Sequence, residues 1–495
     1  MTNFLRIVQV AVFSAVLIAP LLTFLIMGPI DAFENRDQTL FPTIFETLAP
    51  NPEGREQLVS AVLERSAAKR FAISTRNQWL RTYLGFVDEK RVVSGASGWL
   101  FYRPAIAAWD CGKLKSNLYG LDRLVTMVEL ADAASAPLVF AIAPNKASVM
   151  HDKLTGRASI RARCYLDFEK TFRSRIQQVA SPRIVDHYDV LKNPTELAPT
   201  YFRTDTHWTG LGGVRAIAQL GNSKLLSNGP SVTVTPPVGK VEAKTDLNTM
   251  ILSDEREKAT RHRVAVNGKT RKYPKLTIVH DSFYGKTKAA TQVVFPEANY
   301  VHYRELESLI LQPDSQVIIE SVERYLLGRI SSDKLLGWRS HLGHWLLEKS
   351  SQASKDCAWS SGVDLLGADA RLVKTAGKFV KDEATLVTTT GNELIRISVP
   401  KEWSGGNICL QVDIRSAQGS RMQVQLPLSQ TPDQSMKFSQ GASVFVHYKK
   451  HQSTHSIVLP GRIAGNEIRV SPSRAPGAIV QGLRIAPIIA LSNDW

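Results

Sequence analysis

The 495-residue sequence lacks several patterns that mark common functional classes. It has no lysine- and arginine-rich block with interleaved aromatic residues, no zinc-finger spacing and no RNA-binding signature, so nucleic acid is the least favoured partner. It also has no internal repeat of solenoid length and no extended low-complexity tract. A chain of this length with 43% hydrophobic residues can bury more than one core, and two folded domains are expected.

Acidic side chains are in the minority, with 45 Asp and Glu against 61 Lys and Arg, and the formal net charge is +16. A cationic protein favours anionic partners, such as an acidic polysaccharide, phospholipid headgroups or nucleic acid. The charge alone does not choose among these three classes.

Cysteine is scarce, with four residues in the whole chain. Cys111 and Cys164 fall in one expected domain, and Cys357 and Cys409 fall in the other. An even number with one pair in each domain is typical of a disulfide-bonded protein outside the cytoplasm. We predict two intradomain disulfides; the alternative is four buried free thiols.

Charged residues are absent from residues 7–30, and this apolar run is long enough for a helix that spans a bilayer. A cleavable signal peptide is the alternative, but the run is longer than usual and no small-residue cleavage site follows it. Arg6 precedes the run, whereas Asp31 and Glu34 follow it, so the body should lie outside the cytoplasm. We predict a protein anchored in the inner membrane with its body in the periplasm.

The pattern of apolar residues changes along the rest of the chain. Residues 51–86 have helical periodicity, and four later runs are short and apolar, as strands of a buried parallel sheet are: residues 136–143, 183–185, 275–279 and 316–319. Helix-like segments lie between these runs, at residues 121–134, 168–179 and 213–220. The alternation predicts an α/β domain with a parallel sheet.

Residues 349–355 are rich in Ser, Gln and Lys and are interpreted as a linker, and the short strand-like runs beyond them predict a β-sandwich. The expected divisions are a transmembrane anchor at 1–30, a helical lead-in at 31–90, the α/β domain at 91–350 and a β-sandwich at 351–495.

Polar residues follow each predicted strand of the α/β domain, including Asn145 and Lys146, Asp186, and Asp281 and Ser282. In open parallel sheets the ligand binds beyond the carboxyl ends of the strands. We therefore expect these side chains to converge on one cleft.

Two short strings supply the chemistry of a serine-dependent enzyme: Asp205-Thr206-His207-Trp208 and His280-Asp281-Ser282-Phe283. A serine hydroxyl needs an imidazole to take its proton, and a carboxylate that holds the imidazole in the right tautomer. Ser282, His207 and Asp205 could fill these roles, although 75 residues separate the first two and each string alone is typical of an ordinary turn. A metal site formed by Asp205, His207, His280 and Asp281 is the competing interpretation, but neither string has a zinc-binding spacing.

The motifs of the chain resemble those of the AlgX and AlgJ alginate O-acetyltransferases over about residues 50–345. The matching strings are Ser97-Gly98-Trp99-Leu100-Phe101-Tyr102, Pro144-Asn145-Lys146, Asp205-Thr206-His207-Trp208-Thr209, His280-Asp281-Ser282-Phe283 and Glu320-Ser321-Val322-Glu323-Arg324-Tyr325. The resemblance implies a three-layer SGNH-hydrolase-like domain with Ser282 as nucleophile, His207 as general base and Asp205 as the orienting acid. His280 stands where ordinary SGNH hydrolases have glycine, which leaves the geometry of the serine turn open.

The expected function is therefore transfer of an acetyl group, through an acetyl-serine, to hydroxyls of an exopolysaccharide outside the cytoplasm. The resemblance implies a polysaccharide acceptor and a membrane-bound acyltransferase as the source of acetyl; no metal or cofactor is expected. Two alternatives stay open: an acetylesterase with the same triad, and a non-catalytic glycan-binding subunit of an export complex.

Other residues are weaker candidates for substrate contact. Lys146, Tyr284 and Arg304 could line the cleft. In the β-sandwich, which some members of the family use to bind carbohydrate, Trp359, Trp403 and Tyr448 could stack on sugar rings, although most of these aromatic residues are expected to be structural.

Overall fold

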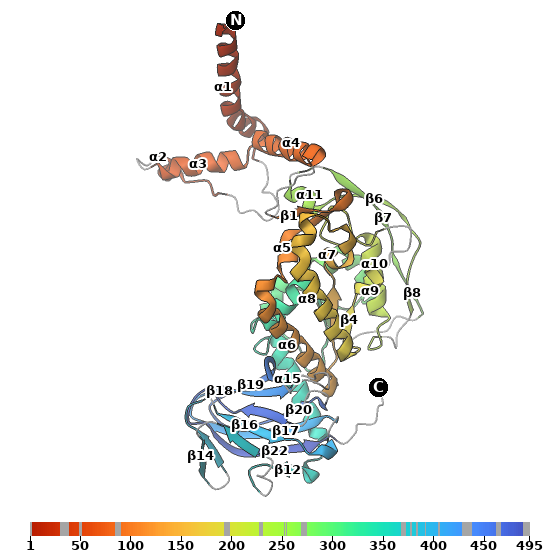
Figure 1. Ribbon diagram of the computed structural model, residues 1–495, viewed down its shortest axis with the longest axis vertical. Coiled ribbons are helices and arrows are strands. Elements are labelled where there is room, and N and C mark those ends of the chain that lie inside the picture. Colours follow the sequence, from red (N-terminus) through yellow and green to blue (C-terminus); the bar gives the residue numbers. More distant parts are fainter. Residues whose placement is uncertain are drawn as a thin grey trace.

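The computed structural model is an elongated molecule, with an isolated N-terminal helix at one end, an α/β domain in the middle and a β-sandwich at the other end (Figure 1). It describes residues 2–29, 39–48, 52–84, 91–192, 199–226, 231–251, 253, 255–268, 275–367, 373–376, 379–382, 385–391, 393–403, 406–427, 438–461 and 467–488.

The N-terminal part is helical. It contains α1 (Thr2–Met27), α2 (Ile44–Leu48), α3 (Glu53–Glu64) and α4 (Ala67–Leu84). Within α1, residues Phe4–Met27 have a mean hydropathy of 2.6 and are not buried by the rest of the protein. This helix is long and apolar enough to cross a membrane, as a signal sequence or an anchor would be. Helices α3 and α4 lie in the segment predicted to be helical.

The central sheet has five parallel strands in the order β10-β9-β11-β3-β4. The strands are β3 (Leu138–Ala143), β4 (Ile184–Asp186), β9 (Leu276–His280), β10 (Asn299–His302) and β11 (Gln316–Val322). Four of them are the predicted apolar runs. The edge strand β10 was missed because it is short and only partly buried, so it lacks a continuous apolar run. The prediction of an α/β domain with a parallel sheet is confirmed.

Helices and small hairpins surround this sheet. The helices are α5 (Arg103–Ala107), α6 (Leu114–Ala133), α7 (Lys146–Val149), α8 (Arg157–Val179), α9 (Tyr188–Lys192), α10 (Gly210–Gly221), α11 (Asp246–Met250), α12 (Ser282–Lys286), α13 (Lys288–Val294), α14 (Glu323–Ser331) and α15 (His341–Ala353). The hairpins pair β1 (Val92–Ser94) with β2 (Leu100–Tyr102), β5 (Ser231–Val234) with β8 (Val264–Asn267), and β6 (Gly239–Lys244) with β7 (Arg256–Arg261). The three predicted helical segments lie in α6, α8 and α10.

Glycine lets α10 pack closely against the loop that precedes it. A Cβ atom at Gly212 would lie 2.2 Å from the carbonyl oxygen of Thr200, and one at Gly213 would lie 2.1 Å from a methyl carbon of Thr287. These two glycines therefore let α10 pack closely on Thr200, in the segment that leads to His207, and on Thr287, which follows α12.

The C-terminal domain is an antiparallel β-sandwich, as predicted. One sheet has the order β14-β15-β22-β17-β20, with β12 also paired to β22, and the other has the order β13-β16-β21-β18-β19. The strands are β12 (Val363–Asp364), β13 (Val373–Ala376), β14 (Phe379–Asp382), β15 (Thr385–Thr388), β16 (Leu394–Ser398), β17 (Ile408–Ser416), β18 (Ser420–Pro427), β19 (Phe438–Tyr448), β20 (His451–Leu459), β21 (Glu467–Ser471) and β22 (Ile479–Pro487).

The segment expected to be a linker is instead helical. Residues 349–353 form the end of α15, and Ser354–Asp356 form a 3-10 helix. Ser350 is buried against the sandwich, where its hydroxyl donates to the carbonyl of Val458 (3.1 Å) and accepts from the amide of Val458 (2.9 Å). The polar composition was misleading because tertiary contacts satisfy these hydroxyl groups.

The two domains pack directly on each other. Helix α6 contacts β19, helix α15 contacts β20, and buried residues of both domains form one continuous hydrophobic cluster. Cys111 is bonded to Cys164, and Cys357 to Cys409, so both predicted disulfides are confirmed.

Candidate active site

Ser282, His207 and Asp205 meet at the carboxyl edge of the central sheet. The hydroxyl of Ser282 lies 2.9 Å from Nε2 of His207, and Nδ1 of His207 lies 2.6 Å from Oδ1 of Asp205. Ser282 is exposed, whereas His207 and Asp205 are buried. With Nδ1 donating to Asp205, Nε2 of His207 is free to accept the proton of Ser282.

Asp205 is held as a carboxylate. Burial favours its neutral form, but hydrogen bonds from the ring and amide of His207 and from the amide of Asp246 outweigh burial and lower its pKa below the usual value. An ionised Asp205 fixes the tautomer of His207 and stabilises the imidazolium that forms when His207 takes a proton.

The turn that presents Ser282 is fixed by the preceding residue, Asp281. One carboxylate oxygen of Asp281 accepts from the amide of Phe283 (2.9 Å) and caps α12, while the other accepts from Val322 (2.9 Å) and from Arg329 (3.2 Å). Asp281 has φ −104° and lies in extended backbone. His280 ends strand β9 and is not among the described residues with positive φ, so its position does not require glycine.

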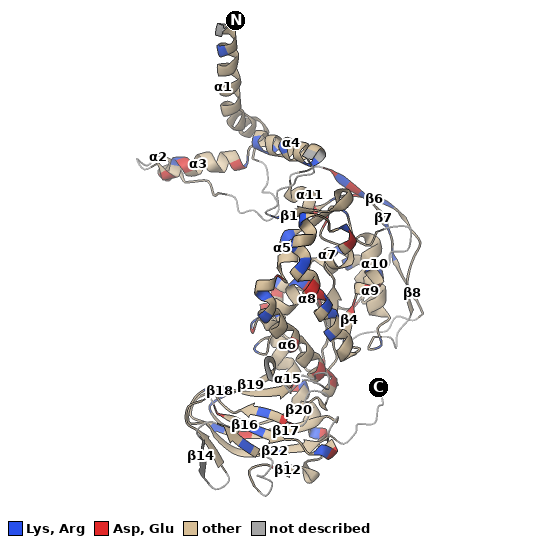
Figure 2. Cartoon of the chain, in the orientation of Figure 1, with Lys and Arg blue, Asp and Glu red and all other residues tan. Residues whose placement is uncertain are grey.

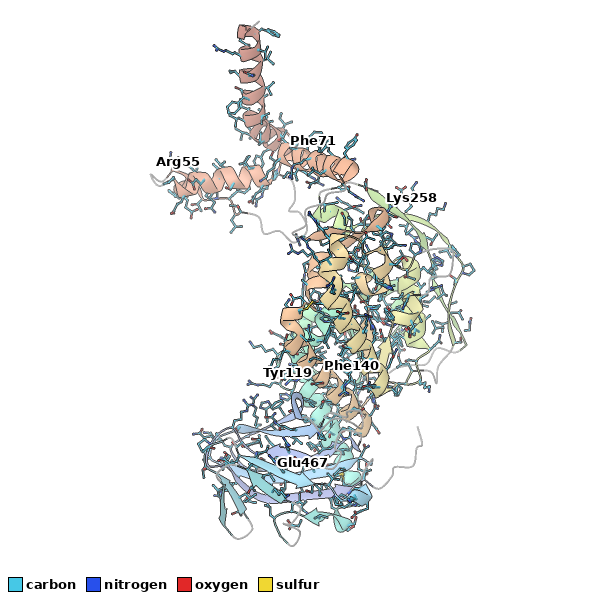
Figure 3. The ribbon with its side chains drawn as sticks, viewed as in Figure 1. Arg55, Phe71, Tyr119, Phe140, Lys258 and Glu467 are labelled. Atoms are coloured by element: carbon cyan, nitrogen blue, oxygen red, sulfur yellow. A yellow bond between two sulfur atoms is a disulfide. The ribbon has the colours of Figure 1, made fainter. Side chains whose placement is uncertain are left out.

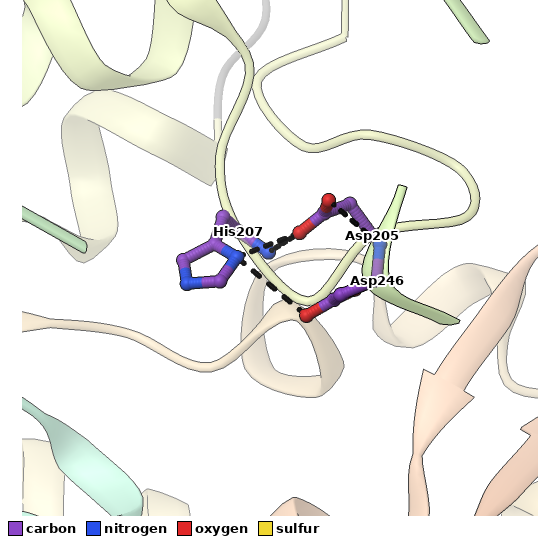
Figure 4. A group of neighbouring side chains, drawn as sticks. All are labelled: Asp205, His207 and Asp246. Atoms are coloured by element: carbon purple, nitrogen blue, oxygen red, sulfur yellow. Dashed lines mark hydrogen bonds and ion pairs between the residues drawn. The ribbon is translucent and has the colours of Figure 1, made fainter. Parts of the chain in front are cut away.

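Asp246 also contacts this site, and the sequence analysis missed it. Figure 4 shows the carboxylates of Asp205 and Asp246 converging on the ring of His207. Oδ2 of Asp246 lies 3.6 Å from Nδ1 of His207, and Oδ1 accepts from the amide of Thr206 at 2.7 Å. Burial first, and then the charge of Asp205, raise the pKa of Asp246 to about 6. Asp246 lies 39 residues beyond His207 at the start of α11, so no local motif marks it.

The metal site weighed from the sequence does not form as a unit. Asp281 pairs with Arg329 and Val322, whereas Asp205 pairs with His207. The described cluster whose spacing could hold a metal ion is Asp205, His207 and Asp246, with ligand atoms within 4.8 Å of one another. In this arrangement Nδ1 of His207 donates a hydrogen bond to Asp205 and is not free to bind a metal ion. We therefore assign the cluster to proton transfer.

Lys146 binds backbone groups next to the site. Its buried ammonium group donates to the carbonyl oxygens of Leu100 (2.6 Å), Arg203 (2.7 Å) and Asp205 (3.0 Å). These three bonds use all of its donors. Burial lowers the pKa of Lys146 to about 7. Lys146 ties the β2 hairpin to the loop that carries His207, and it also lines the small hollow beside Arg324, so its contact with a substrate stays a prediction.

Tyr284 is also structural. It is 2% exposed, and its hydroxyl lies 2.9 Å from Nε2 of the buried His187. Its ring points into the core because it lies on the inner side of α12, so it does not line the cleft. Arg304 is exposed just after β10, at the same carboxyl edge of the sheet, and its role stays a prediction. In the sandwich, Tyr448 is buried and donates to the carbonyl of Pro472 (3.2 Å), so it is not a sugar platform.

Arg324 supplies a cationic group beside the serine turn. Its guanidinium donates to Oδ1 of Asn145 (2.8 Å), and its central carbon lies 5.6 Å from the ring centre of Phe283. Arg324 and Asn145 line a small hollow together with Thr206 and Tyr102. The sequence analysis quoted Arg324 within a motif but assigned no role to it.

Part of the α/β domain matches a known protein family. Residues 92–294 match the family described as SGNH hydrolase-like domain, acetyltransferase AlgX. The match includes Asp205, His207 and Ser282, so this part of the α/β domain is similar to the AlgX/AlgJ type. The resemblance predicted from the motifs is thus confirmed.

The individual relatives are distant. A probable alginate O-acetylase AlgJ of Pseudomonas syringae pv. tomato is 27% identical over 267 residues, which cover 51% of this chain and 62% of the relative. This chain thus spans less than two thirds of the length of that relative. The structure of Pseudomonas aeruginosa AlgX is similar over 84% of this chain and 99% of its own, at 13% identity and a TM-score of 0.35. A family 22 carbohydrate binding module of Clostridium thermocellum Xyn10B is similar over 26% of this chain and 94% of its own, at 8% identity and a TM-score of 0.20.

Proposed function

We propose that the α/β domain of this AlgX/AlgJ-like protein transfers acetyl groups to hydroxyls of a polysaccharide, with Ser282 as nucleophile. The observation that carries the proposal is the chain of hydrogen bonds from exposed Ser282 through His207 to Asp205. The same three residues in this order of contact activate a serine on several unrelated folds.

In the first half-reaction the hydroxyl oxygen of Ser282 attacks the carbonyl carbon of an acetyl ester. The proton of Ser282 moves to Nε2 of His207, and the new imidazolium is stabilised by Asp205 and by Asp246 when its carboxyl group is ionised. The bond between the acetyl carbon and the leaving oxygen then breaks, and that oxygen takes the proton from His207. The products are an acetyl-serine and the free alcohol of the donor.

In the second half-reaction a sugar hydroxyl attacks the acetyl-serine. His207 now takes the proton of the sugar, and Ser282 recovers it as the serine oxygen leaves. The cycle returns Ser282 and His207 to their starting states, and no net proton, metal or redox partner is required. An esterase would carry out the same two half-reactions with water in place of the sugar. A glycan-binding subunit would catalyse neither half-reaction.

The exposure of Ser282 supports a large acceptor. A nucleophile at the surface can reach a hydroxyl on a long polymer, whereas a deeply buried one serves small substrates. The cationic Arg324 and the net charge of +16 favour an acidic polysaccharide. The β-sandwich packs on the α/β domain at the end away from α11 and would bind the polymer at a distance from the site (Figure 1).

The protein works outside the cytoplasm, anchored in the inner membrane by α1. The two disulfides and the exposed apolar surface of α1 support this location. A membrane-bound acyltransferase would then supply the acetyl donor, as the family resemblance implies.

The test compares wild type with Ser282→Ala in the presence of an acetyl ester and a panel of oligosaccharides. Acetylated sugar that forms with wild type alone supports the transferase. Free acetate without acetylated sugar indicates the esterase, and a protein that binds glycan but releases no acetate indicates the binding subunit. Acetylated sugar in equal amount from Ser282→Ala would refute the role of Ser282.

A further inference from the structure

Helix α4 has one face attached to the α/β domain. The amide nitrogen of Asn77 donates to the carbonyl of Ile251 (2.8 Å). Arg81 donates to Asn248 (3.0 Å) and to Glu255 (2.9 Å). Asn77 and Arg81 are four residues apart and thus share one side of the helix, which faces α11 and the residues that follow it.

The opposite face of α4 is an exposed aromatic stripe. Phe71, Thr75, Trp79 and Tyr83 recur at four-residue steps and lie roughly opposite Asn77 and Arg81 around the helix. Phe71 is 74% exposed, Trp79 54% and Tyr83 71%. Large aromatic side chains in a row are rarely left in water without a partner.

Helix α4 begins where α1 ends. The hydroxyl of Thr23 near the end of α1 lies 3.3 Å from that of Ser66, and it accepts from the amide of Ala68 at 3.2 Å. Helix α1 rises from this junction away from the α/β domain and at a steep angle to α4 (Figure 1). Because the domain occupies the other side of α4, the stripe faces the side on which α1 extends.

A second apolar patch lies on the other flank of α1. Ile44 is 75% exposed, Phe45 88% and Leu48 77%, all in the short helix α2. The ring of Phe41, just before α2, lies 5.9 Å from the ring of Phe24 in α1, so this patch continues the apolar surface of α1. Figure 3 shows α3, marked by Arg55, and α4, marked by Phe71, extending to opposite sides of the base of α1.

We propose that these two patches rest in the interface of the membrane that α1 enters, with anionic headgroups as the ligand. We name them the collar: Ile44, Phe45 and Leu48 on one flank, and Phe71, Trp79 and Tyr83 on the other. Helix α4 has four basic and no acidic residues, as its blue colour in Figure 2 indicates. Lys69 and Arg76 border the stripe and would reach lipid phosphates while the rings enter the acyl boundary.

The collar would set the position of the catalytic site relative to the membrane. The face of α4 that binds Asn248 contacts α11, and α11 begins at Asp246, beside His207. A membrane-seated α4 therefore holds the site on the side of the domain that faces the bilayer. A donor delivered from a membrane protein would reach Ser282 over a short path.

The inference rests on the proposed insertion of α1, so the experiment measures both. The full-length protein has no free cysteine, and one introduced cysteine would carry a nitroxide label. Ala72→Cys places the label within the stripe, Ser74→Cys places it on the face toward the domain, and Ser14→Cys places it inside α1. Each protein is reconstituted in vesicles of phosphatidylcholine with phosphatidylglycerol, and collisions of the label with oxygen and with a water-soluble nickel complex are compared.

We expect the label at position 72 to be reached by oxygen and shielded from nickel, and the label at position 74 to show the reverse. If position 14 is shielded from nickel but position 72 is not, the collar is wrong and the anchor stands. If neither position 14 nor position 72 is shielded from nickel, both the collar and the membrane anchor are wrong. Vesicles of phosphatidylcholine alone should weaken the shielding at position 72, because the basic residues lose their anionic partners.

Discussion

Asp246→Asn is expected to lower the proposed acyl transfer at alkaline pH and to leave it unchanged at acid pH. Opposite unit charges about 4 Å apart at an effective dielectric constant of about 20 interact by about 4 kcal/mol. Asp246 lies 3.6 Å from His207, but its side chain is 15% exposed, and solvent screens part of this energy. If about 2 kcal/mol of this interaction remains, its loss in Asp246→Asn destabilises the imidazolium by that amount, and kcat falls roughly 30-fold.

The pH dependence follows from the pKa of Asp246, which is about 6 in the folded protein. Below this pH, wild-type Asp246 is protonated and uncharged, as the asparagine of the variant is at every pH, so the two proteins should have similar rates. Above it, the wild type gains a charge that the variant lacks, and the ratio of their kcat values should rise to its plateau. The assay is release and transfer of acetyl from a chromogenic ester between pH 5 and pH 8.5.

The same substitution should have the opposite effect on stability. A carboxyl group whose pKa is raised on folding binds its proton more tightly in the folded state, so it costs stability as the pH rises from about 4 to about 6. Asp246→Asn should therefore increase the free energy of unfolding at pH 8 and not at pH 4. Glu242→Gln removes a surface charge from β6, the strand that precedes α11, and is the matched control. An equal loss of kcat at pH 5 and pH 8.5, or no loss at either, would refute the electrostatic role.

Three further changes have defined outcomes. His207→Ala and Ser282→Ala should lose acetyl transfer to a similar extent, because the members of such a triad act as a unit; near-normal turnover by the histidine variant would contradict this. Lys146→Met removes the ammonium donor from the carbonyl oxygens of Leu100 and Asp205, and from that of Arg203, which still accepts from the amide of Leu100 (2.9 Å). It should lower the free energy of unfolding by about 2 to 4 kcal/mol in urea titrations, and an unchanged midpoint would show that the buried ammonium is not structural. Replacing Cys357 and Cys409 by serine opens a loop of 52 residues and should cost about 4 kcal/mol of stability in the oxidised protein. When both proteins are reduced, so that Cys111–Cys164 is open in each, the wild type and the variant should unfold alike.

The sequence predicted the features that depend on local pattern. Strands buried on both faces produce continuous apolar runs, so β3, β4, β9 and β11 were found, while the half-exposed β10 was not. The end of α15 was misjudged because Ser350 is polar, yet its hydroxyl is satisfied by the backbone of Val458. Composition cannot show such long-range partners.

The site was predictable where residues lie in motifs and unpredictable where folding alone joins them. Ser282 and His207 belong to recognisable strings. Asp246 contacts His207 from the start of α11, between β6 and β7, and belongs to no motif. Lys146 was expected in the cleft because it follows a strand; it lines the small hollow, but its ammonium turns to three backbone carbonyls, which the sequence did not predict. The direction of a side chain at a strand end depends on what packs above it, which a single sequence does not reveal.

The central claim is that Ser282 carries the acetyl group between donor and acceptor. The most direct test is to mix the protein with a chromogenic acetyl ester, quench it before turnover is complete, and map the modified residue by peptide mass spectrometry. The account predicts one acetyl group on Ser282, lost when an acceptor oligosaccharide is added and absent in Ser282→Ala. Transfer of acetyl to the sugar without any acetylated Ser282, or acetylation at another residue that is competent for transfer, would contradict it.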